Sequence, residues 1–320
     1  MNIIIQTPAP ANTRSGNRVT AERWQAILEN LGHQVVVTSS YSGADADVLI
    51  AIHAWRSAEA IAAFRRAYPG KPIIVCLSGT DIYAYQTSHP AVTRASMEAA
   101  TVLVGLHDLV GKAIPRRFAA KLHTIYQSVP TRHRAKPRAD GFDVCVIGHL
   151  RTEKNPFETA LAARLLPASS RLHITHVGRA MDENWANDAQ AEMAVNPRYL
   201  WLGDVPRERV FQLLATSHVM VLSSRMEGGA NVIGEALAVG VPVIASNIEG
   251  SAGLLGADYP GLYPVGNPAA LSALLLRAET EPAFLAQLAA HCRIRAAQFA
   301  PERERAAWQQ LLATIAPSAA

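Results

Sequence analysis

Short apolar runs alternate along the chain with segments in which apolar residues recur every three or four positions. Runs of this length are typical of buried strands, and the wider spacing is typical of amphipathic helices. The first half predicts strands at Asn2–Gln6, Val35–Thr38, Val48–Ile52, Ile73–Leu77 and Val102–Val104. Helices are expected between them, at Arg18–Leu31, Ala58–Tyr68 and Ala91–Ala99. This alternation predicts a parallel sheet covered by helices on both faces.

The second half repeats the scheme, after a segment without apolar pattern at Ala135–Gly141. Turn-forming residues in that segment favour a linker between two domains. Further strands are predicted at Val144–Ile147, Ile174–Val177, Tyr199–Leu202, Val219–Leu222 and Val243–Ala245. We therefore expect an α/β protein with two doubly wound parallel-sheet domains, at residues 1–138 and 139–300.

Composition narrows the class of protein. The 320 residues are 49% hydrophobic and 18% charged, so a large core is expected and disorder is not. A net charge of +4 suits an enzyme that binds anionic small molecules. No basic run has interleaved aromatic residues, so nucleic acid is not an expected partner. The sequence names no protein partner.

Cysteine usage and the apolar runs indicate a soluble, cytoplasmic protein. The three cysteines have no metal-ligand spacing, and buried reduced thiols are the expectation for them. The N-terminus lacks the pattern of a signal peptide. No apolar run approaches the roughly 18 residues that span a bilayer, so stable membrane insertion is not expected.

The most informative stretch is Ser223–Gly250, which contains two carboxylates, Glu227 and Glu235, and a glycine pair after the first. Its pattern predicts a strand, a glycine-rich turn, a helix, a tight turn and a strand. Backbone N–H groups at a helix N-terminus bind anions, and carboxylates accept hydrogen bonds from hydroxyl groups. The combination indicates a site for a nucleotide sugar.

This arrangement resembles the Glu-x7-Glu motif of the GT-B glycosyltransferases of the family 4 type. Upstream, Gly148–Pro156 resembles the family segment whose cations hold the donor diphosphate, and Lys154 falls on the family's lysine. His149 stands where the family has arginine, and Arg151 is a candidate to replace it. The segments His176–Gly178 and Leu202–Pro206 match two further family elements. The resemblance covers roughly residues 142–300.

The resemblance implies two domains that face each other across a cleft, with the helix at 301–320 packing back on the first domain. It also implies a UDP-sugar donor. The cations of the donor segment are expected to take the place of a metal, so transfer without a metal or other cofactor is expected. The residues carried over as catalytic are Arg151, Lys154 and Glu227. Those carried over for donor binding are Gly148, Gly203, Asp204, Val205, Gly228, Gly229, Asn231, Val232 and Glu235.

Polar segments also follow strands in the first half, where the acceptor is expected to bind. Taken singly, each is typical of a loop or a helix cap. Together they place cations, hydroxyls and glycines at one edge of one sheet, which suits a small anionic acceptor. The candidate acceptor residues are Asn12, Arg14, Gly16, Asn17, His53, Arg56, Ser78, Gly79, Thr80, Asp81 and His107.

Three of these segments, PAPANTRSGNRVTAERW, LIAIHAWRSAEAI and LSGTDIY, are similar to the selenosugar synthases of selenoneine biosynthesis. That resemblance implies transfer of a sugar, typically N-acetylglucosamine, from a UDP-sugar to selenophosphate, with formation of a carbon–selenium bond. Selenium is strongly nucleophilic, so the acceptor needs orientation and charge compensation more than a base. Arg14 and Arg56 are the candidates to hold its phosphate, whereas His107 or Asp81 is a candidate base for a hydroxyl acceptor.

Other functions remain open at this point. Leu109–Leu122 mixes apolar and basic residues, which is typical of a solvated helix and also of a segment that contacts anionic membranes. A glycosyltransferase with a lipid or carbohydrate acceptor is therefore one alternative. A UDP-sugar epimerase or hydrolase on the same architecture is another, and a non-catalytic nucleotide-sugar sensor is a third.

Overall fold

The computed structural model describes residues 1–13 and 15–315. Contacts divide the chain into two units, each of which is described by itself. The first comprises Met1–Ser128, Glu227–Gly229 and the chain from Pro301 onward. The second comprises Val129–Met226 and Ala230–Ala300. The predicted boundary at residues 138/139 thus falls within the second unit, because residues from Val129 onward already pack there.

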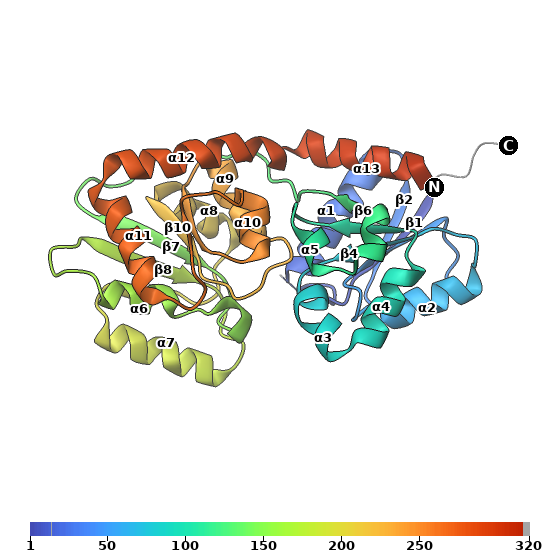
Figure 1. Cartoon of the computed structure of the whole chain (residues 1–320), viewed down its shortest axis with the longest axis horizontal. Helices are drawn as coiled ribbons and strands as arrows, with labels where there is room; N and C mark the ends of the chain where they lie inside the picture. Colours follow the sequence, from blue (N-terminus) through green and yellow to red (C-terminus); the bar gives the residue numbers. More distant parts are fainter. Residues whose placement is uncertain (14, 316–320) are drawn as a thin grey trace. The chain divides into compact units, whose positions relative to one another are not determined.

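The first unit is built on a six-stranded parallel sheet in the order β2-β1-β3-β4-β5-β6 (Figure 1). The strands are β1 (Asn2–Gln6), β2 (Gln34–Thr38), β3 (Val48–Ile52), β4 (Ile73–Leu77), β5 (Val102–Gly105) and β6 (Leu122–Thr124). The α-helices are α1 (Gly16–Asn30), α2 (Ala58–Ala67), α3 (Gln86–Ser88), α4 (Pro90–Ala99), α5 (Val110–Ala113) and α13 (Pro301–Ile315). A π-helical turn, η1 (Asp81–Tyr85), and a 3-10 helix, η2 (Arg116–Lys121), complete this unit.

Alternate residues of these strands enter two separate cores, one on each face of the sheet. Ile3 and Ile5 of β1 pack with α1 and α13, whereas Ile4 packs on the opposite face with Phe64 of α2 and Met97 of α4. Successive side chains of a strand point to opposite faces, so a strand covered on both sides is apolar at every position. This is why the sequence of β3 and β4 reads as an unbroken apolar run.

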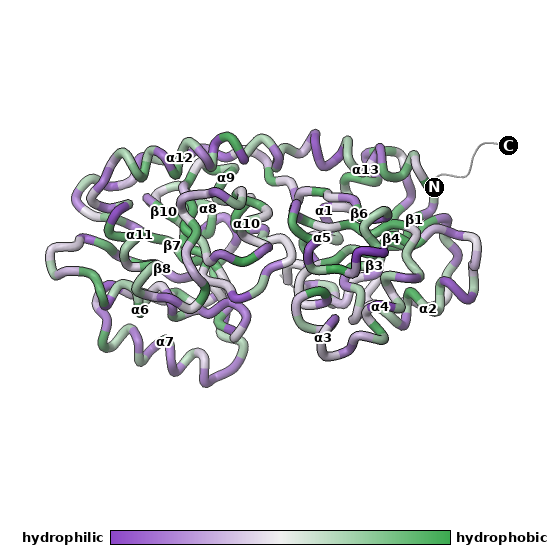
Figure 2. The backbone as a smooth tube through the Cα atoms, viewed as in Figure 1, coloured by the Kyte–Doolittle hydropathy of each residue, from purple (hydrophilic) through white to green (hydrophobic). Residues whose placement is uncertain are grey.

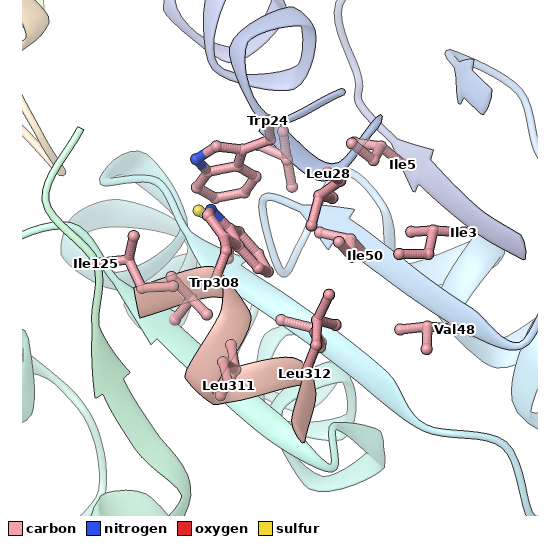
Figure 3. Packing of buried hydrophobic residues seen from close by; sticks show 14 of the residues in the cluster. Ile3, Ile5, Trp24, Leu28, Val48, Ile50, Ile125, Trp308, Leu311 and Leu312 are labelled. Atoms are coloured by element: carbon pink, nitrogen blue, oxygen red, sulfur yellow. The ribbon is translucent and has the colours of Figure 1, made fainter. Parts of the chain in front are cut away.

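Helix α13 is held in the first unit by both apolar and polar contacts. The indoles of Trp308 and Trp24 meet edge to face with centroids 4.8 Å apart, and Leu311 and Leu312 lie beside them (Figure 3). Burial of a leucine side chain contributes about 1.5–3 kcal/mol. The buried carboxylate of Glu304 accepts hydrogen bonds from Trp24 Nε1 (2.8 Å) and the Ser128 backbone N–H (2.8 Å). The helix is therefore part of the core of this unit.

The second unit has its own six-stranded parallel sheet, in the order β12-β11-β10-β7-β8-β9. Its strands are β7 (Phe142–Ile147), β8 (Leu172–Val177), β9 (Tyr199–Trp201), β10 (Val219–Leu222), β11 (Val243–Ser246) and β12 (Leu262–Tyr263). Its α-helices are α6 (Glu158–Arg164), α7 (Glu183–Val195), α8 (Arg207–Thr216), α9 (Asn231–Val239), α10 (Glu249–Leu255), α11 (Pro268–Thr280) and α12 (Pro282–Ala296). Two 3-10 helices are η3 (Thr152–Lys154) and η4 (Ala297–Phe299).

Helices cover both faces of this second sheet, with α6 and α7 on one side and α8, α9 and α12 on the other (Figure 1). Figure 2 shows hydrophobic residues along the inner strand β10, whereas hydrophilic residues recur along the outer helix α7. The residues of β10 and β11 are buried throughout. The predicted α/β class, with two doubly wound parallel sheets, is confirmed.

Some predicted elements differ from the observed ones. Leu109–Leu122 is not one helix: α5 ends at Ala113, Ile114 and Pro115 are extended, and η2 follows. A proline inside the segment lacks the N–H that a continuous helix needs. None of the helices among the described residues is both long enough and apolar enough to span a membrane.

Candidate active site

In the second unit the predicted donor residues lie in the loops after β7 and β9 and in helix α9. All six strands are parallel, so their carboxyl ends share one edge of the sheet, where open α/β sheets bind ligands. The loop after β7 contains Gly148 and Lys154, and the loop after β10 begins at Ser223. A small pocket at this edge is lined by residues that include Gly148, Lys154, His176 and Ser223.

The loops after β7 and β8 approach each other so closely that a side chain would not fit between them. A Cβ atom on Gly178 would lie 2.0 Å from the carbonyl oxygen of Gly148, and the φ of Gly178 is +148°. Beyond the strands the two loops continue to pair, because the Leu150 N–H donates to Arg179 O at 2.9 Å. Glycine at 178 therefore permits the loop geometry that places Gly148.

The buried imidazole of His176 holds the Gly148 loop in this position through a hydrogen bond. Nε2 of His176 donates to the carbonyl of Gly148 (3.0 Å), and Nδ1 accepts from the hydroxyl of Tyr199 (2.9 Å). Burial lowers the pKa of His176 to about 4, so the ring is neutral at pH 7. His176, first noted as part of a family motif, thus supports the loop and lies beneath it.

The loop that bears Lys154 is tied to the end of β10. The hydroxyl of Ser223 donates to the carbonyl oxygens of Lys154 (3.2 Å) and Asn155 (3.0 Å), and the Arg225 N–H donates to Glu153 O (2.8 Å). Asn155 adopts a left-handed conformation, with φ of +46°, at the end of η3. These bonds hold the Lys154 backbone beside Gly148, as expected if the lysine works at a fixed position.

Three cations act electrostatically on His149, the position at which the family resemblance implies arginine. Burial lowers the pKa of the imidazole most, Arg151, Arg179 and Lys154 lower it further, and Asp204 raises it. Arg151 also faces Glu153, with Nε 3.8 Å from Oε2. The edge is thus strongly electropositive, which suits a diphosphate.

Arg179 was missed by the sequence reasoning. Its backbone N–H donates to Nδ1 of His149 at 3.1 Å, and its side chain is exposed. The available signal was a cation directly after Gly178, at the end of a predicted strand. The other polar motifs of this domain likewise follow a predicted strand.

Helix α9 follows Glu227 in the chain and carries Glu235. It begins at Asn231 and includes Val232, and its N-cap residue, Ala230, forms no side-chain hydrogen bond with the first turn. Oε1 of Glu235 lies 3.2 Å from Nη2 of Arg207, and the Glu235 side chain is only 13% exposed. The ion pair orients this carboxylate near the carboxyl ends of the strands.

The loop after β9 provides three further predicted donor residues, Gly203, Asp204 and Val205. Gly203 has φ of +70°, and its carbonyl accepts the N–H of Gly178 at 2.8 Å. Asp204 is exposed and Val205 is half-buried. The structure therefore brings Gly203 to the edge shared with Gly148 and Lys154.

Glu227 belongs, by its contacts, to the first unit, together with the glycine pair Gly228–Gly229. A Cβ on Gly228 would lie 2.1 Å from the carbonyl carbon of Ser78. A Cβ on Gly79 would lie 2.5 Å from the backbone nitrogen of Gly228. Only residues without side chains fit at this contact. The first carboxylate of the motif therefore lies within the unit that contains the predicted acceptor loops.

In the first unit the loops after β3 and β4 are joined through Asp81. Its buried carboxylate accepts four backbone N–H groups, from Ala54 (2.9 Å), Ser78 (3.1 Å), Gly79 (2.8 Å) and Ile82 (3.1 Å). This corrects the prediction that Asp81 binds the acceptor or acts as a base, because its oxygens are already occupied. Asp81 shapes the loops.

His53 and Thr80 form a second link between these loops. Nδ1 of His53 accepts the Arg56 N–H (3.1 Å), so Nε2 carries the hydrogen and donates to the Thr80 hydroxyl (2.9 Å). Burial lowers the pKa of His53, an effect that Asp81 opposes. Its backbone φ is +78°, an uncommon value outside glycine that the surrounding bonds maintain.

His107, the other candidate base, is also engaged. Nδ1 accepts the Leu109 N–H (3.2 Å), and Nε2 lies 3.1 Å from the hydroxyl of Tyr83. The ring is fully buried, which lowers its pKa to about 4. Both nitrogens therefore have partners, and neither is exposed to accept a proton from an acceptor. This corrects the interpretation of His107 as a base.

The remaining acceptor candidates lie at the surface or near it. Asn12, Gly16 and Arg56 are exposed, and Asn17 is half-buried in the first turn of α1. Ser78 Oγ is buried, yet no group among residues 1–13 and 15–315 forms a hydrogen bond with it. Arg14 lies outside the described residues.

Ser57, at the start of α2, forms no side-chain hydrogen bond with the first turn of that helix. Its hydroxyl instead donates to the carbonyl of Ile52 at 2.7 Å. Beside it, the ring of Trp55 stacks on Tyr85 with centroids 4.0 Å apart.

Comparisons with known proteins show the family and the fold of the chain. Residues 130–299 match the family described as "Glycosyl transferases group 1". The fold resembles that of sucrose-phosphate synthase (tll1590) from Thermosynechococcus elongatus, with a TM-score of 0.82, 16% identity and 98% of each chain covered. It also resembles Anabaena Alr3699/HepE in complex with UDP and glucose, with a TM-score of 0.77 and 16% identity over 98% of this chain and 100% of that one.

A third similar structure is a glycosyltransferase from Rickettsia africae ESF-5. Its TM-score is 0.76 at 12% identity, and 98% of each chain is covered. At such identities the likeness concerns the fold. The match therefore extends over both units of this chain, beyond the residues that the family match covers.

Proposed function

Because the chain belongs to the group 1 family of glycosyl transferases, we propose that it transfers a sugar from a UDP-sugar to selenophosphate. The donor is N-acetylglucosamine linked to UDP, and the product carries a carbon–selenium bond. A selenium lone pair attacks C1 of the sugar while the C1–O bond to the diphosphate breaks. UDP leaves with that electron pair, so no oxidant or reductant is required.

The donor part is supported by the cations at the strand ends of the second unit. Lys154 and Arg151 lie in the loop beside Gly148, where they can neutralise the charge that develops on the leaving diphosphate. Preorganised donors of this kind typically contribute about 3–4 kcal/mol each to transition-state stabilisation. Anabaena Alr3699/HepE, whose fold is similar, has been solved with UDP-glucose. We propose that these protein cations act without a metal ion.

The donor's sugar and ribose are assigned to the two carboxylates. Glu235, held by Arg207, accepts hydrogen bonds from the ribose hydroxyls, and Glu227 accepts them from the sugar hydroxyls. The N-terminus of α9 provides N–H groups for the β-phosphate. Gly203 and Val205 contact the uracil through their backbone groups.

The acceptor part is carried by one observation: the two candidate bases of the first unit are both engaged. Asp81 accepts four N–H groups, and both ring nitrogens of His107 have partners. An alcohol acceptor needs a base to remove its proton, whereas selenophosphate is nucleophilic without one. The exposed guanidinium of Arg56 can bind its phosphate oxygens.

Mass spectrometry of the products tests this proposal. The protein is incubated with a panel of UDP-sugars, with selenophosphate, with inorganic phosphate or without an acceptor. We expect a selenium-containing sugar only with selenophosphate and most rapidly with UDP-N-acetylglucosamine. UDP release without a selenium-bearing product would contradict the acceptor assignment, and a new nucleotide sugar formed without any acceptor would indicate an epimerase.

Single substitutions test acceptor binding separately from donor binding. Arg56→Ala is expected to raise the KM for selenophosphate about tenfold or more and to leave that for UDP-N-acetylglucosamine unchanged, since one charge-assisted contact contributes about 1.5–3 kcal/mol. Arg66→Ala, an exposed arginine of α2, is the matched control. Equal KM values for selenophosphate in Arg56→Ala and wild type would remove Arg56 from the acceptor site.

A further inference from the structure

His149 lies between the loops that follow β7 and β8. Its Nδ1 accepts the backbone N–H of Arg179 at 3.1 Å. The flanking residues Leu150 and Ala180 form a parallel bridge, so the two loops are held in register around the ring. The imidazole is half-buried. Its orientation is therefore set by backbone groups.

This hydrogen bond defines the tautomer. A nitrogen that accepts an N–H carries no hydrogen itself, so in the neutral ring Nε2 is the donor. No hydrogen-bond partner of Nε2 is found among residues 1–13 and 15–315. Protonation of Nδ1 would place two N–H groups against each other. His149 thus presents one directed N–H and no charge.

The charge that an arginine at 149 would supply must come from elsewhere. Arg151 faces Glu153 with 3.8 Å between Nε and Oε2, so part of its charge is offset. Arg179 is exposed, and among the described residues no carboxylate lies within ion-pair distance of it. Its charge acts on His149, together with those of Arg151 and Lys154, and Asp204 acts with the opposite sign.

We propose that Arg179 supplies the positive charge that arginine provides at position 149 in related enzymes, while His149 binds the donor diphosphate as a neutral N–H donor. The two functions of one arginine, charge and direction, are divided between two residues on neighbouring loops. The backbone N–H of Arg179 couples them, because it fixes the ring that makes the second contact. This inference rests on the proposed binding of a UDP-sugar at this edge.

Variants that move the positive charge from position 179 to position 149 test this division of roles between Arg179 and His149. We would measure Kd for UDP-N-acetylglucosamine by calorimetry in wild type, Arg179→Ala, His149→Arg and the double variant. Arg179→Ala is expected to weaken binding about tenfold or more, as loss of a charge-assisted contact does. In the double variant the arginine at 149 is expected to restore most of that affinity. Arg179→Lys, which keeps the charge, is expected to bind like wild type.

The controls use residues away from the edge. Arg293→Ala removes an exposed arginine of α12 and is expected to leave Kd unchanged. Wild-type affinity in Arg179→Ala would overturn the proposal. A double variant as weak as Arg179→Ala would overturn it as well.

The number of protons taken up on binding tests the neutral ring. Both phosphates of a UDP-sugar are esterified, so the ligand does not titrate near pH 7, and any uptake comes from the protein. Measured at pH 6.5 in buffers of different ionisation enthalpy, uptake is expected to be close to zero and equal in wild type and His149→Gln. Uptake approaching one proton, lost in His149→Gln, would contradict the neutral donor.

The same titrations distinguish failure of this inference from failure of the proposed function. If wild type does not bind UDP-N-acetylglucosamine or any UDP-hexose, the donor assignment and this inference both fail. If it binds, and Arg179→Ala binds equally well, only the inference fails. A selenium-free product mixture affects only the acceptor assignment.

Discussion

The strand ends of the second unit and those of the first carry similar numbers of polar residues, but these residues are used differently. In the second unit Arg151, Lys154 and Arg179 gather like charges at one edge, held there by backbone and glycine contacts. In the first unit the side chains of Asp81, His53 and His107 instead accept hydrogen bonds from backbone N–H groups of the loops. Gathered like charge costs stability unless a ligand compensates it, which makes the second edge the stronger indication of function.

The contrast teaches how far a polar residue after a strand indicates binding. Asp81 and Lys154 both follow a predicted strand in the sequence. The structure separates them, because a carboxylate that accepts four N–H groups organises a loop, whereas Lys154 lines a pocket at the strand ends and can reach a ligand there. Substitution of Lys154 should therefore affect activity, and substitution of Asp81 should affect stability.

The largest effect is expected for Lys154→Ala. Removal of a cation that stabilises the leaving diphosphate should lower kcat by about 100- to 1000-fold. The melting temperature should change little, since the residue lies at the surface edge. Lys136→Ala, an exposed lysine of the linker, is the control and should retain full activity. Comparable kcat values for the two variants would contradict the role of Lys154.

Gly178→Ala should damage both stability and donor binding. Its Cβ would lie 2.0 Å from the Gly148 carbonyl, and the φ of +148° is unfavourable for alanine. We expect a loss of roughly 3 kcal/mol or more in the free energy of unfolding, measured in urea. Gly203→Ala has an unfavourable φ but no neighbours within 4 Å, so about 1 kcal/mol is expected there. Equal losses of unfolding free energy in the two variants would show that the close approach of Gly178 to the Gly148 carbonyl does not determine stability.

Acid should destabilise the protein through His176. Its pKa of about 4 in the folded state is below that of an exposed histidine, about 6.5, so the unfolded state binds more protons between these values. The contribution of neutral His176 to the free energy of unfolding is complete above pH 6.5. It is lost as the pH falls towards 4, and the total loss is about 3 kcal/mol. Urea unfolding at pH 7 and pH 4.5 measures it. His176→Gln should flatten this dependence, and an unchanged slope would contradict the assignment.

Asp81→Asn is expected to lower stability more than activity, which is the reverse of the effect expected for Lys154→Ala. An amide NH₂ in place of one oxygen faces backbone N–H groups, and we expect a loss of about 2 kcal/mol in the free energy of unfolding. The activity of the folded fraction should decline only through disturbance of the loops. Asp45→Asn, an exposed carboxylate of the same unit, is the control for urea denaturation. If Asp81→Asn abolished activity at wild-type stability, Asp81 would have a direct role in the reaction.

Much of the fold followed from the apolar runs. Strands buried on both faces are apolar at every position, so Val48–Ile52 and Ile73–Leu77 were located to the residue. Strands β6 and β12 were missed because they are only three and two residues long, and β6 includes His123 and Thr124. An edge strand with so few apolar residues has no pattern to detect.

The donor segments could be located in sequence because glycines and cations follow each strand in order. Arg179 was missed because its backbone contact to His149 joins loops 30 positions apart. The role of Asp81 was missed for the same reason, since its partners include Ala54 on another loop. Such contacts depend on strand order, β3 beside β4 and β7 beside β8, which is known only from the folded chain.

A crystal structure of the complex with UDP tests the central claim most directly. The account predicts the diphosphate at the strand ends of the second unit, in contact with Lys154, Arg179 and the N–H groups at the start of α9. The ribose should lie at Glu235. UDP bound away from this edge, or no UDP bound at concentrations that saturate related enzymes, would contradict the account.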